Sequence, residues 1–439
     1  MPVWIVWSAP ADGTLSPRYS LELVMQSVFD VVVVGAGAAG LAAARDLIEA
    51  GLSVAVLEGA HRIGGRAFTE HLPDGSPFDL GCHWMHSASI NPFVAIADQL
   101  GFRYDIREGY GLQWVNQHGA WLDHLAKARL SRASDEWTQA IRTSCDQGLD
   151  NSLYEATDQE GEWRDLLNYW VSLDTSVDVD QVAVGDLINY VDTNENWPVM
   201  DGYGDLVAHW ARGIPVELNS MVNEIDWSRR DIRVRSTRGD LSSRFVVMTV
   251  STGVLNEDVI RFVPHLPTST LDAIAGLPLG NYNRIRLSIS ATLFDSEIPE
   301  RIVSMPVDDQ PMSLSIRPYG RDCVIGLVGG RYADYLEKAG PRASRAVVLD
   351  HLRHVFGGDL LRHVKGDRQS AWRGDPLIRG AYSAAVPGQS FQRAVLSQTL
   401  HEHLLFAGEA TSPDQFSTCH GAALTGRRAA AEIISLSQH

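Results

Sequence analysis

The chain has 439 residues and a mass of 48.2 kDa, which is enough for two or three domains around a large buried core. Hydrophobic residues make up 45% and charged residues 21%, so global disorder and a fibrous repeat are excluded. The formal net charge of −17 argues against a general nucleic-acid binder, which needs a basic surface, and is compatible with a cationic substrate.

Targeting signals and cysteine pairs are not evident in the sequence. No run of about 18 apolar residues is present, so no membrane span is expected. Residues 1–24 lack the basic start and the apolar run of a secretory signal, and we expect them to form an extension outside the fold. Without a CxxC pair, a zinc ribbon is not expected, and reduced thiols in a cytoplasmic protein are the simplest interpretation. The four cysteines are Cys82, Cys145, Cys323 and Cys419. The sequence carries no signal for the oligomeric state.

The first predicted element is a β-branched strand at 29–34, of the kind that is buried on both faces of a parallel sheet. A glycine-rich turn follows, then a helical pattern that ends at Gly51 and a second strand at 53–57. These elements form a complete βαβ unit within about 30 residues. Between 91 and 172 the pattern is mostly helical. Further strands are predicted at 216–222, 232–236, 245–250, 284–290, 323–328 and 404–407, and further helices at 343–356 and 421–436.

The glycine-rich turn has the spacing GxGxxG and lies between a strand and a helix. Gly35 permits the tight turn, Gly37 lets the backbone approach a pyrophosphate, and Gly40 lets the helix pack closely on the strand. The helix N-terminus offers free N–H groups to phosphates. Glu58, at the end of the second strand, is placed to accept hydrogen bonds from ribose hydroxyls. The sequence therefore predicts a dinucleotide site.

A second glycine turn, Arg62-Ile63-Gly64-Gly65-Arg66, follows closely. With it, the stretch VVVGAGAAGLAAARDLIEAGLSVAVLEGAHRIGGRAFT resembles the FAD-binding opening of the flavin amine oxidase family. The resemblance continues through Phe78-Asp79-Leu80-Gly81, Val222 and the segments 380–383, 406–411 and 420–427. It implies that FAD is the cofactor. Its contacts are expected at Gly35, Gly37, Ala39, Gly40, Glu58, Gly59, Gly64, Gly65, Arg66, Gly81, Cys82, His83, Trp84, Val222, Trp372, Gly408, Glu409, Thr418, Gly421 and Ala422.

The resemblance also implies the substrate side of the site. Tyr382 corresponds to one wall of the aromatic sandwich that frames the amine, and Thr418 to the opposite wall, which is not aromatic here. Ala381 stands where monoamine oxidases carry the cysteine that bonds the flavin, so non-covalent FAD is expected. His83-Trp84-Met85-His86 resembles a run of acetylpolyamine and spermine oxidases, in which His86 would bond a substrate nitrogen.

Arg284 departs from the family pattern, which usually has a lysine at this position that holds a water near the flavin. Arginine is always charged and forked, so it is not a neutral replacement. It could still hold the water, slow the reaction with O₂ and so give a dehydrogenase, or bind a substrate carboxylate. A slip in the alignment would instead leave Arg284 as a surface residue of a strand.

We predict an α/β fold with a discontinuous Rossmann-like FAD-binding domain (25–86, 200–290 and 400–439) and an α+β substrate-binding domain (87–199 and 291–399). The expected catalytic residues are His86, Arg284, Trp372, Tyr382 and Thr418, with no metal. The resemblance implies oxidation of a polyamine-like primary or secondary amine by hydride transfer to FAD, giving an imine and then an aldehyde, with O₂ reduced to H₂O₂.

Four other functions remain open at this point. The first is an L-amino-acid oxidase in which Arg284 or Arg317 binds the carboxylate. The others are a carbon–carbon desaturase, a flavin-bound interaction protein and a histone lysine demethylase, although no helical tower insertion is evident for the last. The expected partners are a small amine and O₂, with no nucleic acid and no membrane.

Overall fold

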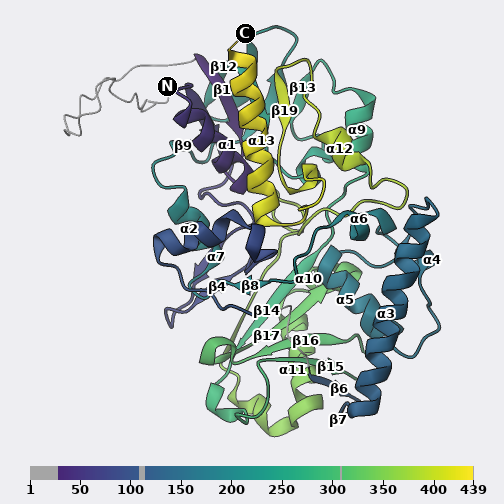
Figure 1. Cartoon of the computed structure of the whole chain (residues 1–439). Coiled ribbons are helices and arrows are strands. Elements are labelled where there is room, and N and C mark those ends of the chain that lie inside the picture. Colours follow the sequence, from purple (N-terminus) through teal and green to yellow (C-terminus); the bar gives the residue numbers. More distant parts are fainter. Residues whose placement is uncertain (1–27, 108–113, 307–308, 439) are drawn as a thin grey trace.

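The computed structural model describes residues 28–107, 114–306 and 309–438. The predicted extension at 1–24 lies outside these residues. Figure 1 shows two parts stacked one above the other, each built around its own sheet. Both ends of the described chain lie in the upper part.

The first sheet has eight strands and is centred on the predicted opening strand. β1 pairs in parallel with β2 on one side and β12 on the other, and its residues Val31–Val34 are at most 3% exposed. This confirms a strand buried on both faces. The strand order is β13-β10-β11-β12-β1-β2-β9, with β19 also pairing with β12. The strands are β1 (Val28–Val34), β2 (Val54–Leu57), β9 (Val216–Glu217), β10 (Val222–Asp226), β11 (Ile232–Ser236), β12 (Gly239–Met248), β13 (Arg261–Val263) and β19 (Leu404–Phe406).

Two helices from opposite ends of the chain cover one face of this sheet. α1 (Ala38–Glu49) and α13 (Cys419–Ser437) run side by side in Figure 1. Gly426 permits the approach, since a Cβ there would lie 2.1 Å from the Ala39 carbonyl oxygen. Val31 and Val33 of β1 pack under these helices, whereas Val32 and Val34 face the core on the other side of the sheet.

The second sheet has seven strands in the order β18-β14-β17-β16-β15-β6-β7. Its strands are β6 (Trp114–Gln117), β7 (Ala120–Trp121), β14 (Tyr282–Ser288), β15 (Arg301–Met305), β16 (Met312–Ile316), β17 (Cys323–Gly329) and β18 (Gly366–Gln369). Two short pairs, β3 (Thr69–His71) with β4 (Pro77–Asp79) and β5 (Trp84–Met85) with β8 (Trp197–Pro198), complete the strands. The predicted α/β fold with a separate second sheet is confirmed.

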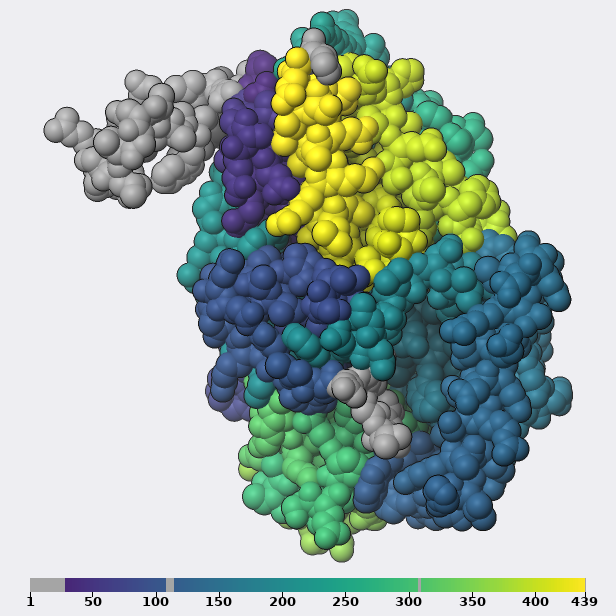
Figure 2. Space-filling model, in the orientation of Figure 1, coloured from purple at the N-terminus to yellow at the C-terminus, as the bar shows by residue number. Residues whose placement is uncertain are grey.

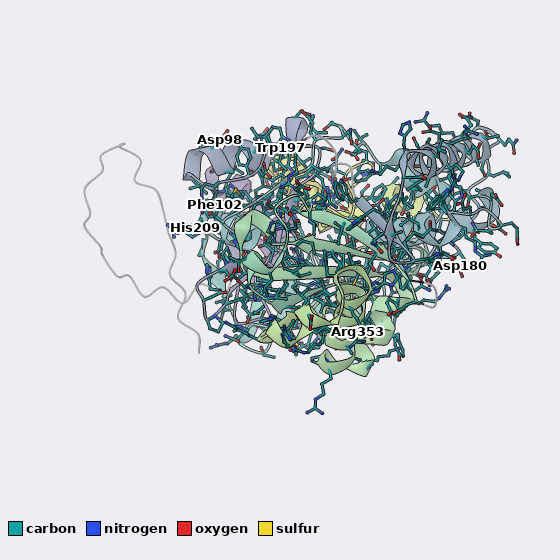
Figure 3. All side chains as sticks on the ribbon, turned by 90° about the horizontal axis from the view of Figure 1, so that it is seen from below. Asp98, Phe102, Asp180, Trp197, His209 and Arg353 are labelled. Atoms are coloured by element: carbon teal, nitrogen blue, oxygen red, sulfur yellow. The ribbon has the colours of Figure 1, made fainter. Side chains whose placement is uncertain are left out.

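The remaining helices lie around the two sheets. They are α2 (Pro92–Leu100), α3 (His124–Asp146), α4 (Leu153–Ala156), α5 (Arg164–Thr175), α6 (Val184–Asn189), α7 (Tyr203–Trp210), α8 (Thr252–Leu255), α9 (Thr268–Ala275), α10 (Gly330–Ala339), α11 (Pro341–Phe356) and α12 (Gln392–Leu396). Aromatic side chains pack between α2 and α7 at one side of the molecule. The ring of Phe102, just after α2, lies 5.3 Å from the ring of His209 in α7 (Figure 3). In the described ranges no helix is long and apolar enough to span a membrane.

Two observations differ from the sequence-based expectations. β14 pairs with β17 and β18 in the second sheet, although the proposed division placed residues up to 290 in the first domain. β6 and β7 lie within the stretch 91–172 that was expected to be mostly helical. β6 pairs in parallel with β15, which follows far along the chain, so its partner could not be found from local pattern.

Candidate active site

A cavity of ≈ 1190 Å³ lies between the two sheets and receives side chains from both parts of the chain. Small-molecule sites are usually about 300–1,000 Å³, so this cavity has room for a large cofactor and a substrate. Figure 2 shows a recess on the surface beside α3, whose residues Lys127 and Asp135 belong to the lining. All but two of the predicted site residues line it. Gly40 and Gly421 do not, and both are packing positions.

The first glycine turn opens one end of the cavity. Gly35 has φ +104°, which favours glycine, and a Cβ on Gly40 would lie 1.9 Å from the Gly35 carbonyl oxygen. Gly37 is different, because a Cβ built there meets nothing within 4 Å and its position faces the cavity. Gly37 also precedes α1 without any side-chain cap, so the first N–H groups of the helix are left for another acceptor.

The second glycine turn lies directly beside the first. The Gly64 amide donates to the Ala36 carbonyl at 2.8 Å, and a Cβ on Gly65 would lie 3.4 Å from the Gly37 Cα. Glu58 holds this region together, since its two carboxylate oxygens accept from the amides of Ala36 and Ala60 at 2.7 and 2.8 Å. Its role toward a ribose stays a prediction.

The N-terminus of α13 forms another part of the wall. Thr418 caps the helix, since its hydroxyl accepts from the Gly421 amide at 3.0 Å and donates to the Gln415 carbonyl at 2.6 Å. A Cβ on Gly421 would lie 1.8 Å from that same carbonyl oxygen. Thr418 lines the cavity, but its hydroxyl is used by the cap, so its role as a substrate wall stays a prediction.

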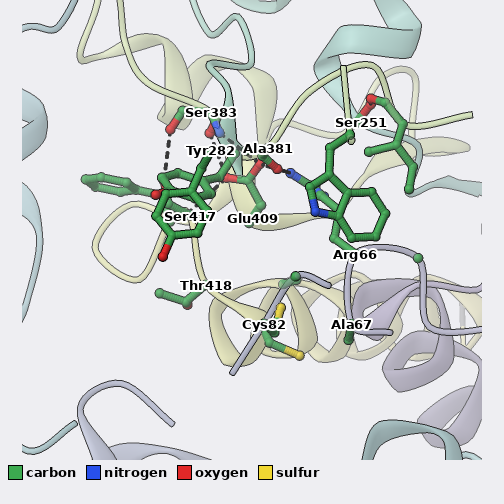
Figure 4. A pocket seen from close by; sticks show the side chains of 18 of the residues that line it. Arg66, Ala67, Cys82, Ser251, Tyr282, Ala381, Ser383, Glu409, Ser417 and Thr418 are labelled. Carbon is green, nitrogen blue, oxygen red and sulfur yellow. Dashed lines mark hydrogen bonds and ion pairs between the residues drawn. The ribbon is translucent and has the colours of Figure 1, made fainter. Parts of the chain in front are cut away.

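Half-buried Arg66 and buried Glu409 form an ion pair in the lining, with Nη1 2.9 Å from Oε1 (Figure 4). Arg66 also donates to the Ala381 carbonyl at 2.6 Å. Glu409 accepts from Ser383 and from the Ser417 amide. Burial alone would raise the pKa of Glu409, but the charges of Arg66 and Arg393 and the hydrogen bonds lower it below its usual value. Glu409 is therefore an anion that fixes Arg66 and two loops, and its contact with FAD stays a prediction.

These residues fit FAD on structural grounds. The α1 N-terminus is uncapped, the Gly37 position is open, and the two glycine turns are joined backbone to backbone. Such a surface of free N–H groups at a helix end suits a pyrophosphate. Val222 and Gly59, which were expected to contact FAD, line the same cavity. The remaining cofactor positions also line it, namely Ala39, Gly81, Cys82, His83, Trp84, Trp372, Gly408 and Ala422.

Aromatic side chains gather in the part of the cavity that faces the second sheet. The rings of Tyr382 and Tyr282 lie 6.0 Å apart, and the Tyr382 hydroxyl donates to the Leu173 carbonyl. Figure 4 shows Tyr282 in this part of the cavity. Phe416 and Tyr190 form a second pair at 5.4 Å. The sequence analysis missed Tyr282, although it lies two residues before Arg284 in a strand, and side chains two apart in a strand share a face.

The two histidines of the HWMH run have different surroundings. His86 Nδ1 lies 2.6 Å from Asn196 Oδ1, and burial lowers the pKa of His86, so the neutral ring is favoured. An amide oxygen only accepts, so the proton is on Nδ1 and Nε2 is the acceptor. His83 instead bonds Asp79 at 2.8 Å. Burial and the charge of Arg284 lower the pKa of His83 to about 4 despite that partner.

Arg284 is 6% exposed and lines the main cavity, so it is not a surface residue of the strand. Its buried Nε has no hydrogen-bond partner among the described residues, and its guanidinium lies 5.7 Å from the Phe78 ring. A second cavity of ≈ 20 Å³ adjoins it, lined also by His83 and Tyr319. This is room for about one water molecule.

Two other expected residues are placed differently. Trp372 is 6% exposed, and its Nε1 donates to the Leu80 carbonyl at 2.9 Å, so the ring is a fixed part of the wall. Arg317 does not line the cavity. Its guanidinium donates to the carbonyls of Ser296 and Ile298, which corrects its proposed role in binding a substrate carboxylate.

Acidic residues also line the aromatic part of the cavity, a feature that the sequence analysis missed. Asp174, in the last turn of α5, lines the cavity and its side chain is accessible from it. Burial and the nearby charge of Asp192 raise the pKa of Asp174 to about 7, against the opposing effect of Arg301. A cation bound here would favour the ionised form of this carboxyl group.

Comparison with known proteins agrees with this site. A family model described as flavin containing amine oxidoreductase matches residues 38–168 and 111–434. The chain belongs to that family. It is an oxidoreductase that acts on amines, and its cofactor is FAD.

Individual relatives support the same class. Polyamine oxidase 4 of Oryza sativa subsp. japonica is 27% identical over 462 residues, covering 97% of this chain and 92% of that protein. Lysine-specific histone demethylase 1 homolog 2 of the same organism is 30% identical, but this chain covers only 57% of it. A solved structure of a putrescine oxidase variant with redesigned cofactor binding has a TM-score of 0.74 at 19% identity and shows the same fold. The structural match covers 93% of this chain and 100% of the putrescine oxidase chain.

Proposed function

We propose that the protein oxidises a polyamine-like primary or secondary amine, giving an imine that hydrolyses to an aldehyde, with O₂ as the final electron acceptor and H₂O₂ as a product. The observation that carries this proposal is the combination of paired aromatic rings and the acidic Asp174 at the second-sheet end of the cavity. An amine cation is attracted both by aromatic faces and by a carboxylate. The similarity to polyamine oxidase 4 supports the same substrate class.

Bound FAD supplies a two-electron acceptor for the hydride on the carbon next to nitrogen. The chain's own residues prepare the substrate. Tyr282 and Tyr382 hold the amine by its apolar and cationic surface. His86, neutral and with Nε2 as the acceptor, takes a proton from the ammonium group so that the reacting nitrogen is uncharged. The walls formed by Trp372 and Phe416 exclude water.

The test is an anaerobic titration of the purified holoprotein with an amine panel, followed by admission of air. Putrescine, spermidine, spermine and benzylamine represent diamines, polyamines and an aromatic monoamine. We expect the yellow flavin absorbance to bleach with polyamines and to return in air with release of H₂O₂. Bleaching by none of these amines would overturn the proposal, and bleaching without rapid return in air would indicate a dehydrogenase.

A second candidate is an L-amino-acid oxidase, favoured by the buried Arg284 with its unpaired Nε. A carboxylate could accept a charge-assisted hydrogen bond from this group. L-amino acids are therefore included in the panel. If they bleach the flavin better than any amine, and Arg284→Lys raises their KM more than that of spermidine, this candidate replaces the first.

A further inference from the structure

Two cysteines meet on the wall of the cofactor cavity. Cys82 follows the glycine at position 81, and Cys419 is the first residue of α13. Both line the cavity, and their side chains are hydrogen-bonded to one another. Figure 4 shows Cys82 on this wall near Thr418 and Ala67. The other two cysteines, Cys145 and Cys323, do not line this cavity.

The surroundings of the two thiols are unequal. The hydrogen bond with Cys419 lowers the pKa of Cys82 and the charge of Arg66 adds to this effect, while burial opposes it. The same contact and burial raise the pKa of Cys419. Cys82 is half-buried and faces the cavity, whereas Cys419 is 7% exposed. Cys82 is thus the better nucleophile, and Cys419 is placed beside it as a resolving cysteine.

We propose that Cys82 and Cys419 are an oxidation site that forms a reversible disulfide in the wall of the cofactor cavity, with hydrogen peroxide as the oxidant. The Cys82 sulfur attacks one peroxide oxygen and the O–O bond breaks. The departing hydroxide takes the thiol proton and leaves as water, and Cys82 becomes a sulfenic acid. The Cys419 sulfur then attacks the Cys82 sulfur, the S–O bond breaks, and a second water leaves. Two electrons have passed from the dithiol to the peroxide.

The disulfide would change the cavity wall. A disulfide has an S–S length of about 2.05 Å, shorter than any contact between two thiols. Its formation draws the segment that contains Cys82 toward the start of α13. His83 and Trp84 follow in the same segment and line the same cavity. We therefore expect oxidation to reduce turnover and a thiol reductant to restore it. Production of peroxide in this cavity rests on the proposed function, whereas the disulfide itself does not.

The experiment uses the holoprotein treated with added H₂O₂, quenched with catalase, alkylated in denaturant and analysed by peptide mass spectrometry. We expect a cross-linked pair of peptides containing Cys82 and Cys419, with Cys145 and Cys323 alkylated as before. Dithiothreitol should return all four thiols. Four alkylated thiols after peroxide, or Cys82 oxidised to sulfinic acid without a cross-link, would overturn the proposal.

Matched variants separate this site from general damage. The double variant Cys145→Ala/Cys323→Ala should give the same cross-link as the natural chain. Cys419→Ser should instead yield a Cys82 sulfenic acid that dimedone traps, and a Cys82 that stays a free thiol after peroxide in this variant would contradict the proposal. For each variant, activity after peroxide is divided by activity before it. This ratio should be about 0.5 or lower only in proteins that contain both Cys82 and Cys419. Cross-linking by added peroxide without any amine-dependent peroxide release would support the site and reject only the proposed source of the oxidant.

Discussion

At the scale of single residues, the charge of Asp174 is the feature most directly tied to substrate choice. Asp174 lines the same cavity as the Tyr382 and Tyr282 pair, and the preceding residue, Leu173, accepts the hydrogen bond of the Tyr382 hydroxyl. Asp135, on α3, is also in the lining but belongs to the exposed rim. These two carboxylates therefore form a natural pair of test and control positions.

Asp174→Asn should raise the KM for diamines and polyamines about tenfold or more, with a smaller effect on benzylamine. The reason is that the cavity walls and the bound substrate shield a charge pair at Asp174 from bulk water, as the raised pKa of Asp174 indicates, whereas Asp135 lies on the exposed rim. Asp135→Asn should change KM by less than about twofold. Steady-state assays of peroxide release check both variants. Equal changes for benzylamine and spermidine would contradict a role for Asp174 in binding a second amino group.

The raised pKa of Asp174 also predicts a pH effect. Below about pH 7 the folded-state carboxyl is largely protonated and neutral, and above it the group is an anion. Binding of a dication should therefore tighten as pH rises through about 7. Substrate amines lose protons at higher pH in both proteins, so the informative quantity is the KM of Asp174→Asn divided by the KM of the natural chain. This ratio should be near one at pH 5.5 and should grow above pH 7.

His86→Ala should lower kcat by about a hundredfold, within the range of general acid–base catalysis, while the protein keeps its flavin. The His86 ring bonds Asn196 and lies on the aromatic side of the site, so its loss removes a proton acceptor. Flavin content is read from the visible absorbance of the purified variant. An unchanged rate at the best amine would exclude His86 from the chemistry. A rate at high pH that approaches that of the natural chain would confirm the proton-acceptor role.

The sequence predicted most of the residues that line the cavity, but it did not predict which side chains contact one another there. The GxGxxG spacing and the HWMH run identified positions that line the cavity, because each is a short local pattern. Asp174, Tyr282 and Phe416 were missed because they come from three distant segments whose approach depends on the packing of both sheets. The ion pair of Arg66 with Glu409 was equally beyond local pattern, although both residues were expected near the cofactor.

At the scale of elements, two helix N-termini face one cavity, and α1 packs against α13 through Gly426. Local signals predicted both helices well. The expected strand at 232–236 coincides with β11, and the predicted closing helix at 421–436 is α13 begun two residues earlier. β6 and β7 were missed because they are short, and β6 contains Asn116, a residue type that is uncommon in strands.

Alanine substitutions of two glycines at the start of α1 should have different effects, one on folding and the other on cofactor binding. Gly40→Ala places a Cβ 1.9 Å from a backbone oxygen, so it should lower Tm or prevent folding. Gly37→Ala has space for the methyl group and an ordinary φ of −77°, so the fold should persist. The methyl group projects into the cavity where a pyrophosphate would lie, and flavin should be lost. Circular dichroism and absorbance measure the two properties. A Gly37→Ala protein that purifies with full flavin content would contradict the location of the pyrophosphate.

At the scale of the whole molecule, the cavity joins two sheets that each have their own core. A ligand that contacts both parts binds only the assembled form and stabilises it by mass action, by about 4 kcal/mol when its concentration is a thousand times its Kd. Removing FAD should therefore lower Tm by several degrees, and adding it back should restore it. ADP, which lacks the flavin, should restore less. Equal Tm values with and without FAD would contradict a cofactor that contacts both parts.

The contact between Ala39 and Gly426 also has a consequence for biosynthesis. The ribosome completes the glycine turns early, but α13 begins only about 350 residues later. Closing a loop of this length has an entropic cost that local structure does not offset. The nascent chain is therefore expected to acquire its yellow colour only after translation of the last segment, and a stalled chain lacking residues 419–437 should stay colourless.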